Sequence, residues 1–439
     1  MRPFGDKKHI ILYIACLAMI SIPIIFRGWF SDGNGEGHAI IVRPEEPAEL
    51  VSYRVPGDFM PDVNERDAAA AKSATDSINS FAFDMYKELS RETTKSVFFS
   101  PQNVSAAFVT LYEGSGEATR KEIGKIFRYR DSSLEDMNTL ATMLSSTPER
   151  IATVEAATSV WPNTSMDIKE TWAVAMRLYT GTDVTKLDYG NDPEASGIIN
   201  RWAEAKTRGR IKNLVEKLDA DTAMVLTSAV YFKSRWDYEF PKENTKRETF
   251  YCAEGTEASA DIMHRRGNIG YCETEMFQAV RIPYKKNAYS MIAMLPRNRS
   301  DLGAQLLARE VYDQVLTSFA IEDVELYLPR FRAETKYELS KNLSAMGLER
   351  AFSDHAEFPG ITDNPIRISK VIHKAFIEVD EKQTEATAIT AVIAVPTASV
   401  IAPSPLQPKI FRADHPFIYF IVENRTNAIL FMGRYSRPE

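Results

Sequence analysis

The sequence has few of the residues that cross-link a chain or bind metals. Only three cysteines occur in 439 residues, and one of them, Cys16, lies in an N-terminal apolar run. A single disulfide between the other two could not stabilise a fold of this size, so a large apolar core must do so. The six histidines are scattered, with no H-E-x-x-H motif and no zinc-type cysteine spacing. The sequence therefore predicts no metal site and no cofactor.

The chain also lacks a net positive charge. The formal net charge of −7 argues against nucleic-acid binding, which favours a basic balance. Neither a G-x-S-x-G motif nor a phosphate-binding loop is present, so hydrolase and kinase chemistry have no support. We therefore expect a protein that is not an enzyme and that meets its partners through a specific site.

The N-terminus has the pattern of a targeting segment. Arg2, Lys7 and Lys8 precede the apolar stretch Ile10–Phe26. That stretch is longer than most cleaved signals and slightly short for a membrane span. Residues 1–30 are thus interpreted as a cleaved signal peptide or as an uncleaved signal anchor. Either one predicts an extracellular location for the rest of the chain, secreted or membrane-anchored.

An extracellular location bears on the cysteines and on glycosylation. Cys252 and Cys272 either pair in an oxidising compartment or remain free thiols. Sequons of the N-x-S/T type predict a glycoprotein. They begin at Asn103, Asn163, Asn298, Asn342 and Asn424.

Composition divides the rest of the chain into a flexible spacer over residues 31–70 and one large domain over residues 71–439. Helical spacing of apolar residues predicts helices over Ile78–Leu89 and Val104–Tyr112, and another that Asp192 caps. Apolar or alternating runs predict strands, including a C-terminal hairpin. The predicted strands are Ala223–Phe232, Tyr289–Leu295, Val324–Leu328, Phe417–Val422 and Ala428–Met432. Helices that come early and give way to strands indicate an α+β fold.

The stretch Ala386–Pro408 contains no Asp, Glu, Lys, Arg or His. Small and β-branched residues fill its first half, and prolines interrupt its second half. If it formed a strand, one face would be small and uncharged, so that this face could pack on a core without burying a charge. That face would carry Thr384, Ala386, Ala388, Thr390, Val392 and Ala394. The stretch is therefore compatible both with an exposed loop and with a place in a sheet.

Several segments occur in an order that resembles one protein family. TEATAITAV at Thr384–Val392, preceded by Glu381, is similar to the hinge of inhibitory serpins. The other matching segments are FAFDMYKEL at Phe81–Leu89, FFSP at Phe98–Pro101, TRGRIKNLV at Thr207–Val215, VYFKSRW at Val230–Trp236, FPKENTKRETF at Phe240–Phe250, LPRF at Leu328–Phe331, HKAFIEVDE at His373–Glu381, ADHPF at Ala413–Phe417 and ILFMGRY at Ile429–Tyr435. The resemblance extends over Ala71–Glu439.

The resemblance implies a monomer with three β-sheets, about nine helices and an exposed reactive-centre loop. It also implies an inhibitor of serine proteases: the protease attacks the loop, forms an acyl-enzyme and is trapped as the cut loop inserts into the central sheet. Strand insertion of this kind is a recognised binding mode, for which serpins are a standard example. Counting from Glu381 places the scissile bond at Thr397–Ala398, with Val395, Ala398, Val400 and Ile401 as alternatives. These residues are small or aliphatic, which favours an elastase-like target.

Two positions depart from the hinge pattern of inhibitory serpins. Gln383 stands where Gly is usual, and Ile389 stands where a small residue is usual. A bulky Ile would slow insertion and let the protease cut the loop as an ordinary substrate. The hinge that the resemblance identifies consists of Glu381, Gln383, Thr384, Glu385, Ala386, Thr387, Ala388, Ile389 and Thr390. The rival interpretation is a non-inhibitory serpin that carries a ligand or acts as a chaperone, and a third is a membrane-anchored interaction module.

The resemblance also identifies residues beneath the central sheet, at its shutter, and at its upper end, the breach. Ser100 and His373 match the shutter, and Trp236 matches the breach. Asn103 replaces a usual Ser, and Ser228 replaces a usual Asn. We therefore hypothesise that Asn103 and Ser228 have exchanged roles, in which case Asn103 is buried and its sequon is unused. Two unrelated substitutions would explain the pattern equally well.

One cluster of positive charge stands out against the acidic background. It is either a solvated helix face or a site for a polyanion such as a glycosaminoglycan. Its members are Arg120, Lys121, Lys125, Arg128 and Arg130.

Overall fold

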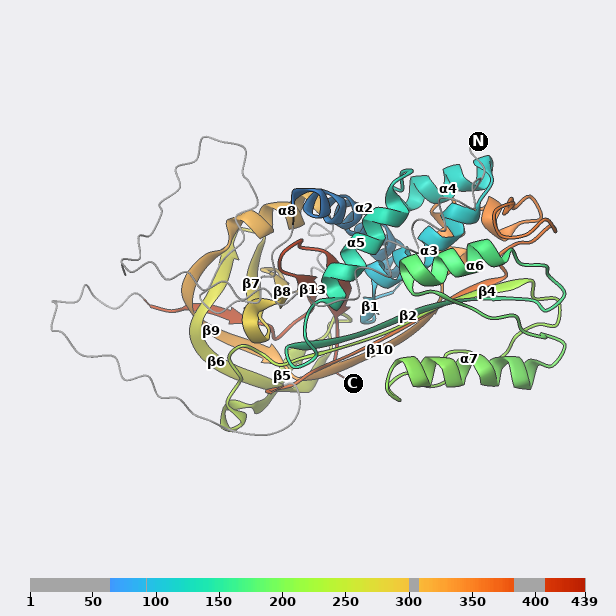
Figure 1. The fold of residues 1–439 in the computed structure, drawn as a ribbon. Coiled ribbons are helices and arrows are strands. Elements are labelled where there is room, and N and C mark those ends of the chain that lie inside the picture. Colours follow the sequence, from blue (N-terminus) through green and yellow to red (C-terminus); the bar gives the residue numbers. More distant parts are fainter. Residues whose placement is uncertain (1–63, 92, 300–307, 383–406, 439) are drawn as a thin grey trace. The chain divides into compact units, whose positions relative to one another are not determined.

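The computed structural model describes residues 64–91, 93–299, 308–382 and 407–438. These residues form an α+β fold (Figure 1), which confirms the predicted class. Eight α-helices lie in the described ranges, where about nine helices were expected, together with three short 3₁₀ turns. The α-helices are α2 (Glu65–Ser90), α3 (Pro101–Gly114), α4 (Glu117–Phe127), α5 (Ser133–Ser145), α6 (Glu170–Thr180), α7 (Asp192–Lys206), α8 (Arg309–Ser318) and α9 (Ser340–Ala345). The 3₁₀ turns are η1 (Lys242–Asn244), η2 (Lys285–Asn287) and η4 (Arg350–Phe352).

A five-stranded sheet lies between two layers of helices. Helices α3, α5 and α6 cover one face, and α7 covers the other (Figure 1). The strand order is β10 (Phe331–Glu338), β11 (Lys370–Val379), β4 (Met224–Ser234), β2 (Ala152–Pro162), β3 (Asp183–Val184). Because both faces are covered, β4 is almost entirely buried, and its sequence is mostly apolar rather than alternating.

The remaining strands of the described residues join in one nine-stranded sheet. Its order is β1 (Val97–Phe99), β14 (Ile429–Tyr435), β13 (Phe417–Glu423), β8 (Tyr289–Pro296), β7 (Phe277–Pro283), β6 (Glu257–Glu273), β9 (Ala320–Pro329), β12 (Lys409–Arg412), with β5 (Lys246–Tyr251) paired to β6. Two sheets therefore stand where three were expected. The reason is that β6, with 17 residues, pairs with β5 through its first part and with β7 through its last part, so hydrogen bonds run continuously between the two groups of strands.

The pairing of β11 with β4 is parallel, whereas both outer neighbours of this pair run antiparallel to it. The register runs from Lys370 opposite Val225 to Ile377 opposite Phe232. We call this ladder the seam. A parallel ladder has slanted hydrogen bonds and is slightly less stable per residue than an antiparallel one.

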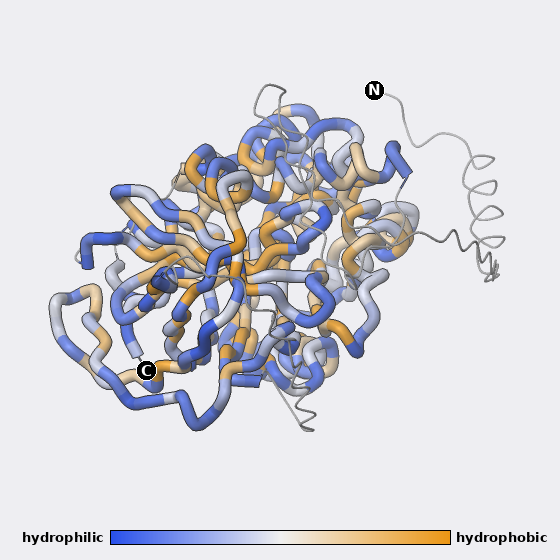
Figure 2. The backbone as a smooth tube through the Cα atoms, turned by 90° about the vertical axis from the view of Figure 1, so that its left-hand side faces the viewer, coloured by the Kyte–Doolittle hydropathy of each residue, from blue (hydrophilic) through white to orange (hydrophobic). Residues whose placement is uncertain are grey.

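Apolar residues concentrate where strands and helices meet, and polar residues occupy the turns (Figure 2). The aromatic core is continuous across the nine-stranded sheet, where Phe98 stacks on Phe431 with ring centroids 5.2 Å apart. Burial on this scale gives the stability that disulfides cannot supply here, at roughly 25 cal/mol per Å² of apolar surface.

Most elements lie where the sequence predicts them, but the starts of all three predicted helices differ, and α3 begins at Pro101 rather than Val104. Helix α2 begins at Glu65 rather than near Ile78, so it extends into the range interpreted as spacer. The Asn64 side chain caps it, accepting a hydrogen bond of 2.9 Å from the Asp67 amide. Helix α7 includes Asp192 as its first residue, and the Asp192 carboxylate accepts from the Leu218 amide instead of capping its own helix.

The predicted targeting segment, residues 1–30, and most of the predicted spacer lie outside the described residues. Among the described helices, none is both long enough and apolar enough to cross a membrane. The extracellular location therefore stays a prediction.

Gly433 provides a test of the packing between β1, β14 and β13. A Cβ atom at Gly433 would lie 2.7 Å from the Tyr419 ring and 2.7 Å from the Val97 carbonyl oxygen. Because a backbone atom is one of the two obstacles, we expect Gly433→Ala to destabilise the fold by about 1–3 kcal/mol. Urea unfolding measures this. Gly197→Ala in α7 is the control, since its Cβ would meet only the tip of Arg201 and alanine favours a helix; equal loss in both variants would contradict the packing argument.

Candidate functional site

The predicted reactive bond and most of the hinge lie outside the described residues. These are Gln383, Thr384, Glu385, Ala386, Thr387, Ala388, Ile389, Thr390, Thr397 and Ala398. The chain is described up to Lys382, directly after β11, and again from Gln407, directly before β12. The structure therefore places the two ends of this segment and the strands to which they belong.

The first of these ends is anchored at Glu381, which is 4% exposed. Its carboxylate accepts a hydrogen bond of 2.7 Å from the Thr245 hydroxyl and lies 3.7 Å from the Arg330 guanidinium. Its carbonyl accepts from the Phe240 amide at 2.9 Å. Thr245 and Arg330 were not identified from the sequence, because no local pattern links residues so far apart in the chain to Glu381.

Trp236 holds the neighbouring residue. The Trp236 indole N–H donates to the Asp380 carbonyl at 2.8 Å, and its ring stacks on Tyr284 with centroids 4.4 Å apart. Trp236 follows β4, whereas Asp380 follows β11. The breach therefore ties together the two strands of the seam at the point where the undescribed segment begins.

His373 lies at the centre of the shutter and is fully buried. Its Nδ1 lies 2.9 Å from the Ser228 hydroxyl, directly across the seam. Its Nε2 accepts a hydrogen bond of 3.0 Å from the Ser100 amide, and the Ser100 hydroxyl donates to the Leu430 carbonyl. The network thus connects β11 to β4, to the start of α3 and to β14.

These contacts determine the tautomer of His373. An amide can only donate, so Nε2 carries no proton, and Nδ1 must donate to Ser228. Burial lowers the pKa of the His373 imidazole from 6.5 to about 3, only partly offset by its contact with Ser228. The ring is therefore neutral at physiological pH, and protonating it would leave the Ser100 amide without an acceptor.

Asn103 belongs to the same network and is 2% exposed. Its amide nitrogen donates to the Ser228 hydroxyl at 2.8 Å and to the Ala157 carbonyl at 3.4 Å. The exchange of roles between Asn103 and Ser228 requires this burial and this contact, although the exchange itself stays a prediction. A glycan on Asn103 would be incompatible with the network.

The other sequons differ in their surroundings. Asn424 is 9% exposed, and its amide donates to the Asn287 carbonyl, whereas Asn298 is exposed. Asn163 and Asn342 are half-buried. Glycosylation stays a prediction, best supported by exposure at Asn298.

The two cysteines of the domain are free thiols, which decides between the alternatives that the sequence left open. Cys252 is buried, and burial raises the pKa of the half-buried Cys272 thiol to about 11. No cluster of three or more His, Cys, Asp or Glu suited to a metal ion occurs in the described part of the chain.

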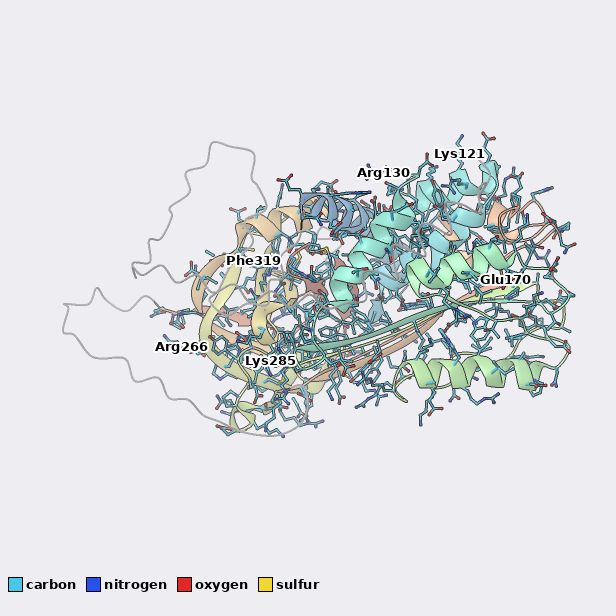
Figure 3. All side chains as sticks on the ribbon, in the orientation of Figure 1. Lys121, Arg130, Glu170, Arg266, Lys285 and Phe319 are labelled. Carbon is cyan, nitrogen blue, oxygen red and sulfur yellow. The ribbon has the colours of Figure 1, made fainter. Side chains whose placement is uncertain are left out.

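The basic cluster is partly neutralised within the molecule. Arg120 lies 3.5 Å from both Glu113 and Asp131, and Arg128 pairs with Asp84 at 2.8 Å. Arg130 donates to the Ser73 hydroxyl. Lys121 and Lys125 make no ion pair with described residues, and Lys121 projects from α4 (Figure 3). The Ser73 hydroxyl does not neutralise Arg130, which makes no ion pair with described residues, so polyanion binding stays a prediction that rests on Lys121, Lys125 and Arg130.

Comparisons with known proteins agree with the geometry. The family model described as Serpin (serine protease inhibitor) matches residues 76–438. A serpin-like protein of Methanosarcina acetivorans is 36% identical over 391 residues, which cover 86% of this chain and 89% of the relative.

Solved structures share the fold at lower identity. Human thyroxine-binding globulin complexed with thyroxine has a TM-score of 0.76 at 24% identity, over 84% of this chain and 99% of its own. Native protease nexin-1 with heparin has a TM-score of 0.74 at 23% identity, over 85% and 100% of the two chains. The order of strands, the buried hydrogen-bond network around His373 and the family match over most of the length lead to one conclusion: this chain belongs to the serpin family, whose members are generally protease inhibitors rather than catalysts.

Proposed function

We propose that this protein traps a serine protease by inserting its cut reactive loop between β11 and β4. The observation that carries the proposal is the seam, a parallel pair of strands next to the start of the loop segment. A chain that leaves the end of β11 and turns back runs antiparallel to β11 and, because the seam is parallel, antiparallel to β4 as well. One inserted strand would therefore pair with both neighbours.

The chemistry of the loop suits that position. Strands β4 and β11 are buried on both faces, so an inserted strand must present no unpaired charge. From Ala386 to Pro408 the segment has none. Its small face, which includes Ala386 and Ala388, fits beneath covering helices.

The free energy that loop insertion could release is large enough to drive the trap. Insertion replaces one parallel ladder with two antiparallel ones, which adds roughly a dozen hydrogen bonds at about 1 kcal/mol each. The gain, on the order of 10 kcal/mol, is released only when the loop is cut. In the trap, the protease serine attacks the carbonyl of Thr397 and releases the amine of Ala398, and insertion then displaces the acyl-enzyme before water completes hydrolysis.

We propose an elastase-like protease as the target and an extracellular site of action. The residues around the bond are small or aliphatic, and the nearest Lys or Arg after the bond is Lys409. A trypsin-like pocket would hold a buried acid that this loop leaves unpaired. The extracellular site is supported by the charged and apolar N-terminal pattern.

A ligand carrier is the second candidate. Gln383 and Ile389 depart from the inhibitory hinge pattern, and a carrier of thyroxine shares the fold. The two candidates differ in one property, because only an inhibitor must complete insertion before the acyl-enzyme is hydrolysed.

The direct test mixes the purified protein with pancreatic elastase, chymotrypsin and trypsin. We expect an elastase complex that survives denaturing electrophoresis, with a new peptide that begins at Ala398 in mass spectrometry. Thr397→Arg should transfer complex formation to trypsin, since it provides the cation that the trypsin pocket requires. Loop cleavage without a stable complex, and without a rise in thermal midpoint, would instead favour the carrier.

The hinge departures predict how efficiently the trap closes. We expect Ile389→Ala to increase the fraction of elastase that is trapped rather than released, because a smaller side chain enters the sheet faster. The number of inhibitor molecules consumed per protease measures this fraction. Leu406→Ala is the control, since residue 406 follows the predicted bond and all of its alternatives and does not insert; an equal effect of both changes would contradict the role of Ile389.

The seam should weaken in acid because of His373. Its pKa is depressed in the folded state, so its stabilising contribution is complete above pH 6.5 and is lost as the pH falls from 6.5 towards 3. The loss approaches about 1.4 kcal/mol per pH unit. Urea unfolding between pH 7 and pH 4 measures the slope. His373→Gln should flatten it, whereas His355→Gln, at an exposed position, should not; identical slopes in all three proteins would refute this assignment.

A further inference from the structure

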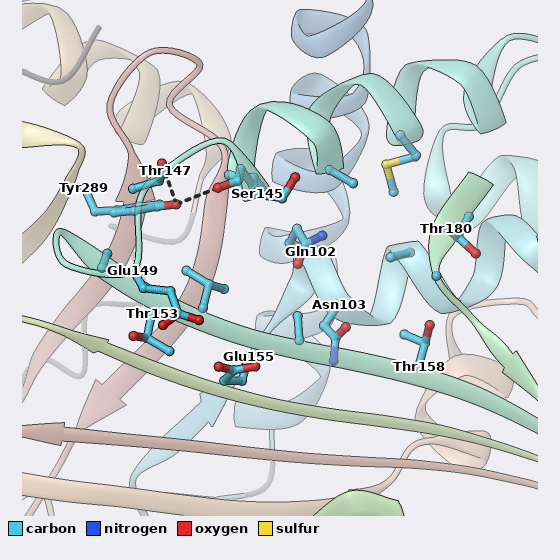
Figure 4. Close-up of a pocket in the computed structure, with 18 of the residues that line it drawn as sticks. Gln102, Asn103, Ser145, Thr147, Glu149, Thr153, Glu155, Thr158, Thr180 and Tyr289 are labelled. Carbon is cyan, nitrogen blue, oxygen red and sulfur yellow. Dashed lines mark hydrogen bonds between the residues drawn. The ribbon is translucent and has the colours of Figure 1, made fainter. Parts of the chain in front are cut away.

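A cavity of about 380 Å³ lies beside the shutter, between β2 and the helices α3 and α5 (Figure 4). The end of α6 and the segment after α7 complete it. This volume is in the range of sites for small organic molecules. The family resemblance and the proposed trapping mechanism make no use of it.

One side of the cavity is apolar. Helices α3 and α5 contribute the wall, which is made of Ala106, Met137, Ala141 and Leu144. Such a wall favours a ligand with a hydrocarbon or aromatic body, since burying it releases roughly 25 cal/mol per Å².

The floor holds two carboxamides with unused acceptor oxygens. Gln102 is 9% exposed, faces the cavity in Figure 4, and makes no side-chain hydrogen bond with described residues. Asn103 donates its amide hydrogens to Ser228 and Ala157, but its oxygen accepts no hydrogen bond from them or from any other described residue. Neither oxygen is fully buried, so both are accessible from the cavity, where they can accept hydrogen bonds from a ligand that donates.

The mouth carries excess negative charge. Arg208 bonds to Glu149 at 2.7 Å and to Glu155 at 2.6 Å, so one guanidinium balances two carboxylates. All three residues line the cavity. A cation entering here gains from this imbalance, whereas an anion would lose.

We propose that this cavity binds a small amphipathic amine, an ammonium group attached to an apolar body. The ammonium has three donors and no acceptor, which matches the oxygens of Gln102 and Asn103 and the excess carboxylate at the mouth. The apolar body lies against α3 and α5.

Binding of the amine in the cavity should affect how readily the seam opens for loop insertion. This part of the inference rests on the proposed trapping function. Asn103 connects the cavity to the shutter, because its nitrogen donates to Ser228 on β4. Insertion moves β4 away from β11, and Ser228 then leaves His373. An amine that fixes the Asn103 carboxamide favours the closed seam, so it must bind the uninserted form more tightly and shift the insertion equilibrium towards that form by the same factor.

The first measurement is binding, which involves no protease. Dansylcadaverine, a naphthalene derivative with a primary amine, is titrated into the full chain, and the rise in its fluorescence is followed. We expect saturable binding that Ala141→Phe abolishes and that Gln102→Leu weakens about 3- to 10-fold. Thr142→Phe on the exposed side of α5 should leave it unchanged. N-pentyl dansylamide, which lacks the amine, should bind at least 3-fold more weakly.

Thermal midpoints show that the variants fold, since Gln102→Leu removes an unpartnered amide and should not destabilise the protein. Absence of saturable binding by folded protein, binding unaffected by Ala141→Phe, or equal affinity for the two probes would each overturn the proposed site. Loop-cleaved protein should bind dansylcadaverine more weakly than intact protein. Equal affinity of the intact and cleaved forms would overturn the coupling to the seam. A failure to inhibit elastase would contradict the trapping function alone, since binding is measured without it.

Discussion

The hydrogen bond between His373 and Ser228 is the constraint on which the rest of this molecule depends. It crosses the seam between two parallel strands that are buried on both faces. Through its second nitrogen, His373 also satisfies the amide of Ser100, and Ser100 in turn satisfies the Leu430 carbonyl. The seam therefore holds as one unit, because losing one bond leaves a buried polar group unsatisfied at a cost of about 1–3 kcal/mol.

This kind of restraint suits a strand pair that must open completely or not at all. Apolar contacts between strands weaken gradually with distance, whereas the hydrogen bonds of a buried polar network are lost together. Asn103 extends the network beyond the sheet, since it connects Ser228 to the cavity under α5. The presence of Asn at position 103 thus gives the cavity a direct connection to the seam, which a shorter serine side chain would not provide.

Regular patterns made much of the fold predictable from the sequence. The apolar runs of β4 and β8 and the hairpin of β13 and β14 are local features, and they lie where expected. The first turns of α2 were missed because Ala-rich residues after Glu65 carry little apolar periodicity. The continuity of β6 was missed too, since its Arg265, Arg266 and Gly267 interrupt any strand pattern. Their pairing is fixed by β9, far along the chain.

The candidate site, like the fold, was predictable from the sequence only in part. The uncharged loop and the position of His373 followed from residue types and the family resemblance, whereas the burial of Asn103 was one of two alternatives that the sequence left open. The partners of Glu381 did not follow from the sequence, because Thr245 and Arg330 reach it only after the chain has folded. The sequence shows which segment could enter a sheet, because that segment carries no charge. Only the strand pairing in the structure shows between which two strands it could insert. A loop without charges could enter any buried sheet, but a parallel pair that begins beside the loop offers it two antiparallel neighbours at once.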